Sequence, residues 1–301
     1  MRQPAIFVDW GTSNFRAFLV EGSTGECLDR RVSDRGLRTL QTKEFAAYLG
    51  AQIAAWRDAG NIPVYLAGMV GSARGWRECP QLDLPLDAQA LAAALTPVPG
   101  LPDAWILPGA RVVNDTKVDV MRGEEVQALG ALALAGMRDA TLCLPGTHSK
   151  WVRAGGGKLL DFTTLMTGEL YQAVRFHTLI GEPARGDSPF DPAAFASGLD
   201  SVEAPGGVLH ALFEGRSRML QSGLAPQQVA SYLSGALIGE EVRCMRQTTP
   251  ALDRVLLVGA ERLQAPYMQA LRYNGIEPLW IDSDQASLAG MRAVAGIHAG
   301  A

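Results

Sequence analysis

Residues 6–20 constrain the fold of this chain more than any other segment. They read Ile-Phe-Val-Asp-Trp-Gly-Thr-Ser-Asn-Phe-Arg-Ala-Phe-Leu-Val, an apolar run on each side of a short polar stretch. The pattern predicts two strands joined by a tight turn, with Asp9 at the end of the first strand. Gly11 lets the backbone approach a ligand closely, and hydrogen-bond donors follow it at Thr12, Ser13 and Asn14.

An acid that can hold hydrated Mg²⁺ beside donors that can hold phosphate favours a site for the triphosphate of a nucleotide. An ordinary β-hairpin has the same local pattern, so the rest of the chain has to decide between the two. We predict Asp9 as the residue that holds Mg²⁺.

The composition excludes several other functions. The chain has 301 residues, and a hydrophobic content of 48% is typical of globular domains. Its net charge of −4 argues against a nucleic-acid surface, because phosphate groups require clustered positive charge. The four cysteines and four histidines show no metal-ligand spacing. No apolar run is long enough to span a bilayer and no signal peptide opens the chain, so we expect a cytoplasmic protein without membrane contact.

The second half of the chain repeats the opening pattern. Residues 141–144 form an apolar run that leads into Pro145 and then into a second polar glycine turn, formed by Gly146, Thr147 and His148. Two such turns could hold a triphosphate from both sides. We therefore predict a duplicated α/β fold with a cleft between its halves. The predicted domains are 1–117, completed by a C-terminal helix at 285–301, and 118–284.

Apolar spacing predicts the other elements. Strands are expected at 5–8, 15–20, 25–32, 104–107 and 111–113, and helices at 43–58 and 120–135. Helices dominate 167–247, and the chain closes with strand, helix, strand, helix at 254–258, 263–273, 277–281 and 285–296.

Phosphoryl transfer to a hydroxyl requires a carboxylate that orients the hydroxyl and accepts its proton. The segment Val112-Val113-Asn114-Asp115-Thr116 places an acid after an apolar strand and before the predicted helix at 120–135. We predict Asp115 as this base, although Asn114 and Asp115 could equally be residues that cap the helix. Asp119 and Glu124 are the alternatives.

Cationic side chains near these segments could bind an acidic substrate. Arg122 stands beside Glu124 and Glu125, and such a run is commonly a solvated start of a helix. Its guanidinium could instead bind a carboxylate with both nitrogens. The predicted substrate residues are Arg122, Glu124, Lys150 and Arg74. Near the end of the chain, Gly259 and Ala260 follow an apolar strand and could pack against adenine, although a plain strand-to-helix junction looks the same.

These segments together resemble the 2-dehydro-3-deoxygalactonokinase family of the sugar kinase/Hsp70/actin superfamily. The resemblance runs nearly end to end. The strings that carry it are Val8-Asp9-Trp10-Gly11-Thr12-Ser13-Asn14-Phe15-Arg16-Ala17, Ala67-Gly68-Met69-Val70-Gly71-Ser72, Val120-Met121-Arg122-Gly123-Glu124-Glu125, Leu144-Pro145-Gly146-Thr147-His148-Ser149-Lys150-Trp151, Thr167-Gly168-Glu169-Leu170 and Leu233-Ser234-Gly235-Ala236-Leu237-Ile238-Gly239. One departure is Pro145, which stands where the superfamily often has an acid and so removes a second metal-binding acid.

The resemblance implies two ribonuclease-H-like domains of the actin and hexokinase type around an ATP cleft. It implies a kinase that uses ATP and Mg²⁺ to phosphorylate 2-dehydro-3-deoxy-D-galactonate at O6 in galactonate breakdown, and at family level a homodimer. The alternatives are a kinase of another acidic or amino sugar, an ATP-binding regulator of the same fold, or a sugar-binding module without catalysis. The residues alone do not decide between galacto and gluco substrates.

Overall fold

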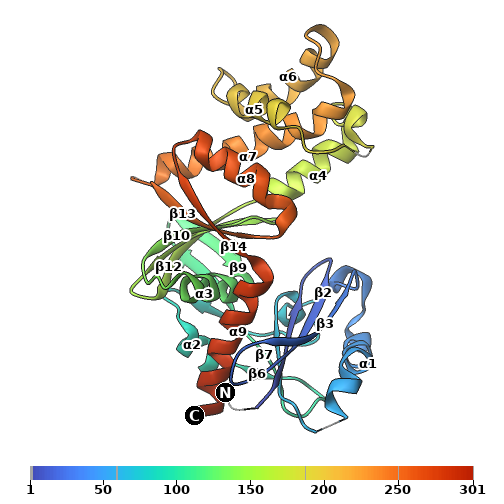
Figure 1. Ribbon diagram of the computed structural model, residues 1–301, viewed down its shortest axis with the longest axis vertical. Coiled ribbons are helices and arrows are strands. Elements are labelled where there is room, and N and C mark those ends of the chain that lie inside the picture. The colour runs from blue at the N-terminus through green and yellow to red at the C-terminus, as the bar shows by residue number, and fades with distance from the viewer. Residues whose placement is uncertain (1–2, 59, 187, 250, 301) are drawn as a thin grey trace. The chain divides into compact units, whose positions relative to one another are not determined.

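The computed structural model describes residues 3–58, 60–186, 188–249 and 251–300 (Figure 1). The chain divides into two compact units. Unit 1 comprises Met1–Ala140, Val152–Phe162 and Ser283–Ala301, and unit 2 comprises Thr141–Trp151 and Thr163–Asp282. The predicted domain limits at 1–117, 118–284 and 285–301 stay a prediction, and their terminal residues 1, 2 and 301 lie outside the described residues.

A six-stranded sheet forms the centre of unit 1, in the order β3-β2-β1-β4-β7-β6. Its strands are β1 (Ala5–Trp10), β2 (Phe15–Val20), β3 (Cys27–Ser33), β4 (Val64–Ala67), β6 (Thr96–Pro97) and β7 (Ala104–Ile106). Every residue of β1 is buried, and β1 pairs with β2 in antiparallel and with β4 in parallel register. The predicted strand, turn and strand at residues 6–20 are therefore confirmed.

The helices of unit 1 pack either on its sheet or on one another. They are α1 (Phe45–Arg57), α2 (Ala88–Ala93), α3 (Glu124–Ala135) and α9 (Ser283–Gly300). The buried face of α1 presents residues at helical spacing to the apolar core of the sheet, namely Phe45, Leu49, Ile53 and Trp56. Glycines at the crossing of α3 and α9, Gly130 and Gly290, let the two helix backbones approach closely.

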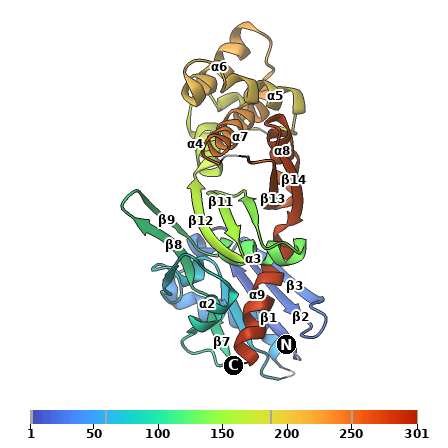
Figure 2. The same cartoon turned by 90° about the vertical axis from the view of Figure 1, so that its left-hand side faces the viewer.

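A small three-stranded sheet in unit 1 corrects one prediction. It has the order β5-β8-β9 and consists of β5 (Gln81–Asp83), β8 (Gly109–Asn114) and β9 (Lys117–Met121). The predicted start of a helix at 120 is wrong, because 117–121 pairs with β8 as a hairpin and α3 begins only at Glu124. Figure 2 shows this hairpin with its turn at the free end, and Val113 and Val118 beside the turn are exposed.

The second large sheet has the order β12-β11-β10-β13-β14. Its strands are β10 (Ala140–Leu144), β11 (Ser149–Gly155), β12 (Lys158–Leu165), β13 (Arg254–Gly259) and β14 (Glu277–Asp282). The central strand β13 pairs in parallel with β10 and with β14. Parallel strands lie with their carboxyl ends at one edge, so the turns that follow β10 and β13 leave the sheet at the same edge.

The described residues of unit 2 form the α-helices α4 (Thr167–His177), α5 (Pro192–Ser201), α6 (Gly207–Gln221), α7 (Val229–Thr248) and α8 (Glu261–Tyr273). Long and largely buried, α7 packs against α5 through the glycines Gly198 and Gly235. The helix-rich interpretation of residues 167–247 is confirmed.

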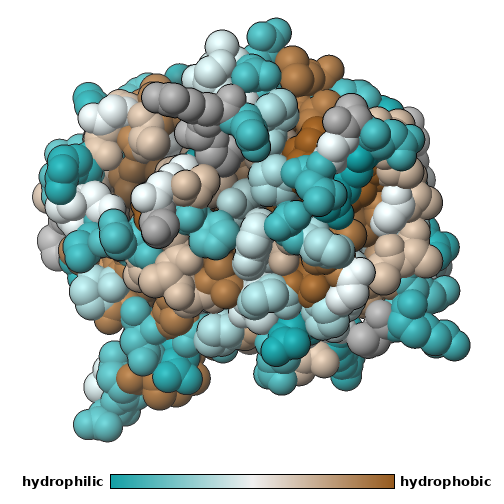
Figure 3. Space-filling view, turned by 90° about the horizontal axis from the view of Figure 1, so that it is seen from below, coloured by the Kyte–Doolittle hydropathy of each residue, from teal (hydrophilic) through white to brown (hydrophobic). Residues whose placement is uncertain are grey.

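Short 3₁₀ helices occur at Leu37–Thr39, Thr42–Glu44, Met69–Gly71, Glu182–Ala184 and Pro226–Gln228. No helix in the described part of the chain is long and apolar enough to cross a membrane. The face of the molecule drawn in Figure 3 intermixes hydrophilic and hydrophobic residues, as protein surfaces commonly do.

Candidate functional site

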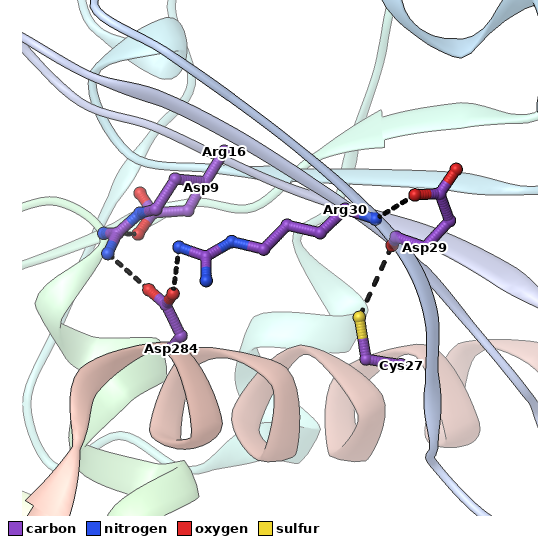
Figure 4. A network of polar contacts seen from close by, with 6 residues as sticks. All are labelled: Asp9, Arg16, Cys27, Asp29, Arg30 and Asp284. Carbon is purple, nitrogen blue, oxygen red and sulfur yellow. Dashed lines mark hydrogen bonds and ion pairs between the residues drawn. The ribbon is translucent and has the colours of Figure 1, made fainter.

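The β1–β2 hairpin places Asp9 opposite Arg16, and a chain of ion pairs extends from this pair to Asp284 and Arg30 (Figure 4). Arg16 donates from Nη2 to Asp9 Oδ2 and from Nη1 to Asp284 Oδ1, each at 2.5 Å. Arg30 on β3 forms a second ion pair with Asp284, at 2.7 Å. Since Asp284 lies in the first turn of α9, these ion pairs join the first strands of the chain to α9.

Asp9 is 9% exposed, and this burial sets its electrostatics. Burial raises the pKa of Asp9, while the Arg16 guanidinium lowers it and the carboxylates of Asp284 and Glu124 raise it further. The net shift is upward, because the desolvation of the carboxylate outweighs the ion pair. Glu124 therefore lies near enough to Asp9 for their charges to interact.

The turn after Asp9 is fixed from outside by a second segment. Gly11 donates its N–H to Asn14 O at 2.9 Å, while Leu37 and Arg38 donate theirs to the carbonyls of Gly11 and Thr12. Ser13 and Asn14 at the tip of the turn are exposed. The turn is thus held rigid while its polar tip remains in contact with solvent.

Two glycines bring further backbone close to Asp9. Gly68 has φ of 95°, and a Cβ on it would lie 2.8 Å from Trp10 O and 3.4 Å from Asp9 Oδ1. Gly123 has φ of 107°, and a Cβ on it would lie 3.1 Å from the Cα of Gly68. Both positions need glycine for their conformation and for space. They place the loop after β4 and the start of α3 beside Asp9.

The start of α3 gathers acidic groups. Glu124 accepts from the N–H of Arg122 at 3.0 Å, and both carboxylate oxygens of Glu125 accept from the N–H of Gly123 at 2.8 Å. Burial and the neighbouring Glu124 raise the pKa of Glu125 to about 8. Three carboxyl groups, those of Asp9, Glu124 and Glu125, therefore lie in one part of unit 1.

Arg122 reaches inward from this segment. Its Nη2 donates to Cys79 O at 2.9 Å, and its Nη1 is buried without a hydrogen-bond partner among the described residues. A buried guanidinium nitrogen without a partner is costly, and an anion could complete its hydrogen bonding. Arg74, by contrast, lies exposed on the loop that follows the 3₁₀ helix Met69–Gly71.

The structure places Asp115 differently from the prediction. It lies exposed in the turn between β8 and β9, where the Asn114 side chain accepts hydrogen bonds from the N–H and the hydroxyl of Thr116. The premise that residues 114–116 lead into a helix is therefore wrong. Asp119, on β9, accepts from the N–H of Val120 at 2.8 Å. The catalytic role of Asp115 stays a prediction.

In unit 2, the predicted second turn is supported by the first turn of α4. Glu169 donates its N–H to Thr147 O at 2.8 Å, and its carboxylate lies 2.6 Å from His148 Nε2. Gly168 packs its backbone directly on this turn, because a Cβ there would lie 3.0 Å from the carbonyl carbon of Gly146 and closer still to its oxygen. Lys150 is 4% exposed, and its ammonium donates to the carbonyl of His148 at 3.3 Å.

A cavity of about 380 Å³ opens beside this turn, entirely within unit 2. Most of its wall comes from the helices α4, α7 and α8, and the second turn contributes Gly146. The helical residues that line it include Thr167, Gly168, Ser234, Arg262 and Tyr267. Gly259 and Ala260 connect β13 to α8, so they lie next to the helix that lines the cavity.

The sequence did not predict the ion pairs around Asp9 or the cavity in unit 2. Arg16 stands in a string that the resemblance singled out, and antiparallel pairing across the predicted hairpin could have placed it beside Asp9. Asp284 carries no such signal, because it comes from a segment far away in the sequence. Thr167, Gly168 and Ser234 in the cavity wall stand in strings that the resemblance also singled out, but their spacing in the sequence did not show that they line one cavity.

The fold is that of the actin-like ATPases and sugar kinases. A glucokinase of the ROK family from Streptomyces griseus, solved with glucose and AMPPNP, superimposes with a TM-score of 0.51 at 14% identity, covering 99% of this chain and 100% of that one. That likeness concerns the fold alone, and it confirms the predicted class of ribonuclease-H-like α/β domains of the actin and hexokinase type.

The family follows from closer relatives. The 2-keto-3-deoxy-galactonokinase family model matches residues 9–294, and the chain belongs to this family. The 2-dehydro-3-deoxygalactonokinase of Escherichia coli (strain K12) is 39% identical over 96% of this chain and 97% of its own. A crystal structure of a Sinorhizobium meliloti protein assigned to the same activity superimposes with a TM-score of 0.90 at 35% identity, over 97% and 98% of the two chains. The predicted family and the predicted enzyme class, a phosphotransferase, are confirmed.

Proposed function

We propose that this chain transfers the γ-phosphoryl group of ATP to the O6 hydroxyl of 2-dehydro-3-deoxy-D-galactonate, a step in galactonate breakdown. One observation carries the proposal: a relative of that activity matches nearly the whole chain at 39% identity. The match extends over the segments that hold Asp9 in unit 1 and Gly146 in unit 2.

The nucleotide part of the proposal is supported in each unit separately. In unit 2, the turn of Gly146, Thr147 and His148 leads to a cavity of a size suited to a nucleoside. In unit 1, the exposed tip of the 11–14 turn offers donors for phosphate oxygens. Contacts of one triphosphate with both turns, and of adenine with Gly259 and Ala260, stay predictions.

The carboxylate of Asp9 fits a magnesium ion that arrives with ATP. Among the described residues no three carboxylate, histidine or cysteine groups cluster as a metal site. Mg²⁺ commonly needs only one or two carboxylates, since waters and phosphates supply the remaining ligands. When bound, the ion neutralises charge on the phosphates. Arg16 already occupies Oδ2 of Asp9, so Asp9 would hold the ion through water or through Oδ1.

We propose Glu124 as the group that orients the acceptor hydroxyl and takes its proton. Glu124 begins α3 and interacts electrostatically with Asp9, where Gly68 and Gly123 leave room for close approach. Asp115 lacks these neighbours, because the hairpin carries it to an exposed turn. A general base must reach the hydroxyl directly, so position favours Glu124.

The substrate carboxylate needs a cationic partner, and Arg122 remains the first choice. Its buried Nη1 has no partner among the described residues, and its backbone bonds to Glu124. Lys150 and Arg74 are the second and third choices. The predicted homodimer and cytoplasmic location stay predictions.

A coupled ADP-release assay with Mg²⁺-ATP tests the activity, with 2-dehydro-3-deoxy-D-galactonate and its gluconate epimer offered in parallel. We expect turnover with the galactonate compound to exceed turnover with the epimer strongly. Comparable rates with both would refute the stereospecificity. ADP release with neither would favour a kinase of another acidic or amino sugar, or an ATP-binding regulator of the same fold.

A further inference from the structure

Unit 2 contains a fully buried carboxylate that the proposed chemistry does not use. Glu241 on α7 is 1% exposed. Its Oε1 accepts from Trp151 Nε1 at 2.9 Å, and its Oε2 accepts from the hydroxyls of Tyr267, at 3.0 Å, and Thr167. The Cys143 thiol also lies 3.8 Å from Oε1, and all four partners are uncharged donors. Taking a carboxylate out of water without a cation is costly, and an apolar side chain would fill the same space at lower cost. Stability alone therefore does not explain Glu241.

The partners of Glu241 come from four different elements. Cys143 belongs to β10 and Trp151 to β11, while Thr167 is the first residue of α4 and Tyr267 lies on α8. Ser149 extends the network, since its hydroxyl lies 2.9 Å from that of Tyr267. One side chain thus fixes the sheet and two helices relative to one another within unit 2.

Two of these partners belong to the wall of the cavity. Thr167 and Tyr267 both line it, and their hydroxyls are oriented by the same carboxylate oxygen. Thr167 also starts the helical turn whose Gly168 packs on Gly146 and whose Glu169 bonds to Thr147. The position of the predicted phosphate turn therefore depends on Glu241 through α4.

We propose that Glu241 is a positioning residue for nucleotide binding: it holds α4 and α8 so that the cavity and the turn at 146–148 keep their binding geometry. The inference rests on the proposed binding of ATP in unit 2. A glutamine at this position would bring an amide donor toward groups that are themselves donors, so at least one of the three hydrogen bonds would be lost or reversed.

The neighbouring Glu240 supplies a matched control. It carries the same side chain on the same helix, but it pairs with Arg243 at 2.8 Å and is only partly buried. Glu241→Gln and Glu240→Gln therefore make the same chemical change at adjacent residues, and only the first disturbs the cavity wall.

The test compares the wild-type protein with these two variants, by calorimetric titration with Mg²⁺-AMPPNP and by steady-state kinetics with each substrate varied in turn. We expect Glu241→Gln to raise the Kd for the nucleotide and the KM for ATP about tenfold, since a hydrogen bond to a buried charge is lost. The KM for the sugar acid should stay within about twofold, and Glu240→Gln should match the wild type.

Three outcomes would overturn the inference. An unchanged nucleotide Kd in a folded Glu241→Gln protein would show that Glu241 does not position the cavity. Equal increases of both KM values would show a general loss of structure instead. If the wild type itself binds no nucleotide, the proposed ATP site fails together with the inference.

A second variant decides the matter if Glu241→Gln does not fold. Tyr267→Phe removes one donor hydroxyl and keeps the ring, and we expect it to raise the nucleotide Kd about threefold. No change in the Kd of a folded Tyr267→Phe protein would contradict the inference.

Discussion

Gly290 lies where α9 crosses α3, and its replacement by alanine should destabilise unit 1. A Cβ at this position would lie 2.9 Å from the carbonyl carbon of Val126 and closer still to the carbonyl oxygen. Carbon atoms in contact prefer separations of about 3.5–4.0 Å, so the two helix backbones would have to move apart. The obstacle is backbone, which cannot turn aside as a flexible side chain can.

The magnitude follows from two opposing effects. Overpacking typically costs about 1–3 kcal/mol, and contact with backbone places this case at the upper end. Alanine regains up to about 1 kcal/mol because it favours the helix over glycine. We expect a net loss of about 2 kcal/mol in the free energy of unfolding.

Gly296 on the same helix is the matched control. A Cβ there would meet nothing within 4 Å, so Gly296→Ala should stabilise the protein by about 0.5–1 kcal/mol. The two variants differ only in what the added methyl group contacts, and they should shift stability in opposite directions.

Urea denaturation followed by circular dichroism measures both changes, and hydrogen exchange of the amides in α9 assigns them to unit 1. With an m-value of about 2–3 kcal/mol per molar urea, Gly290→Ala should lower the midpoint by about 0.7–1 M. A midpoint equal to that of the wild type, or above it, would refute the argument that backbone contact fixes the distance between α3 and α9.

Three further predictions concern the acidic groups of unit 1. Glu124→Gln should lower kcat at least about 100-fold, while Asp115→Asn should stay near the wild type; the reverse pattern would return the role of base to Asp115. Asp9→Asn should raise the Mg²⁺ concentration for half-maximal rate about tenfold, since Mg²⁺ prefers a carboxylate to an amide, and an unchanged metal dependence would exclude Asp9 as its ligand. The folded protein raises the pKa of Glu125 to about 8, so the folded state holds a proton that the unfolded chain releases near the ordinary pKa of 4.5. The stability of the wild type should therefore fall as the pH rises from about 5 to 8, by up to about 1.4 kcal/mol per pH unit, and Glu125→Gln should remove this slope. If urea denaturation between pH 5 and pH 9 gave the wild type and Glu125→Gln the same dependence of stability on pH, Glu125 would ionise normally.

The sequence by itself determined the first hairpin, most of the longer helices and strands, and the family. Alternating and helical spacing are local properties, so residues 6–20 predicted two strands and a turn, and residues 45–56 predicted the buried face of α1. The two glycine turns and the strings around them were enough to indicate the family, because those strings are distinctive in themselves.

The tertiary structure decided which charged groups act on one another. Arg16 and Asp284 stand 268 positions apart, and Glu241 and Trp151 stand 90 apart, so no local pattern could join them. Local pattern also failed to place Asp115, which was predicted at the site and lies away from it. An acid after an apolar strand looks alike whether a helix or a second strand follows. Only the pairing of β9 with β8 placed Asp115 in an exposed turn and left Glu124 beside Asp9.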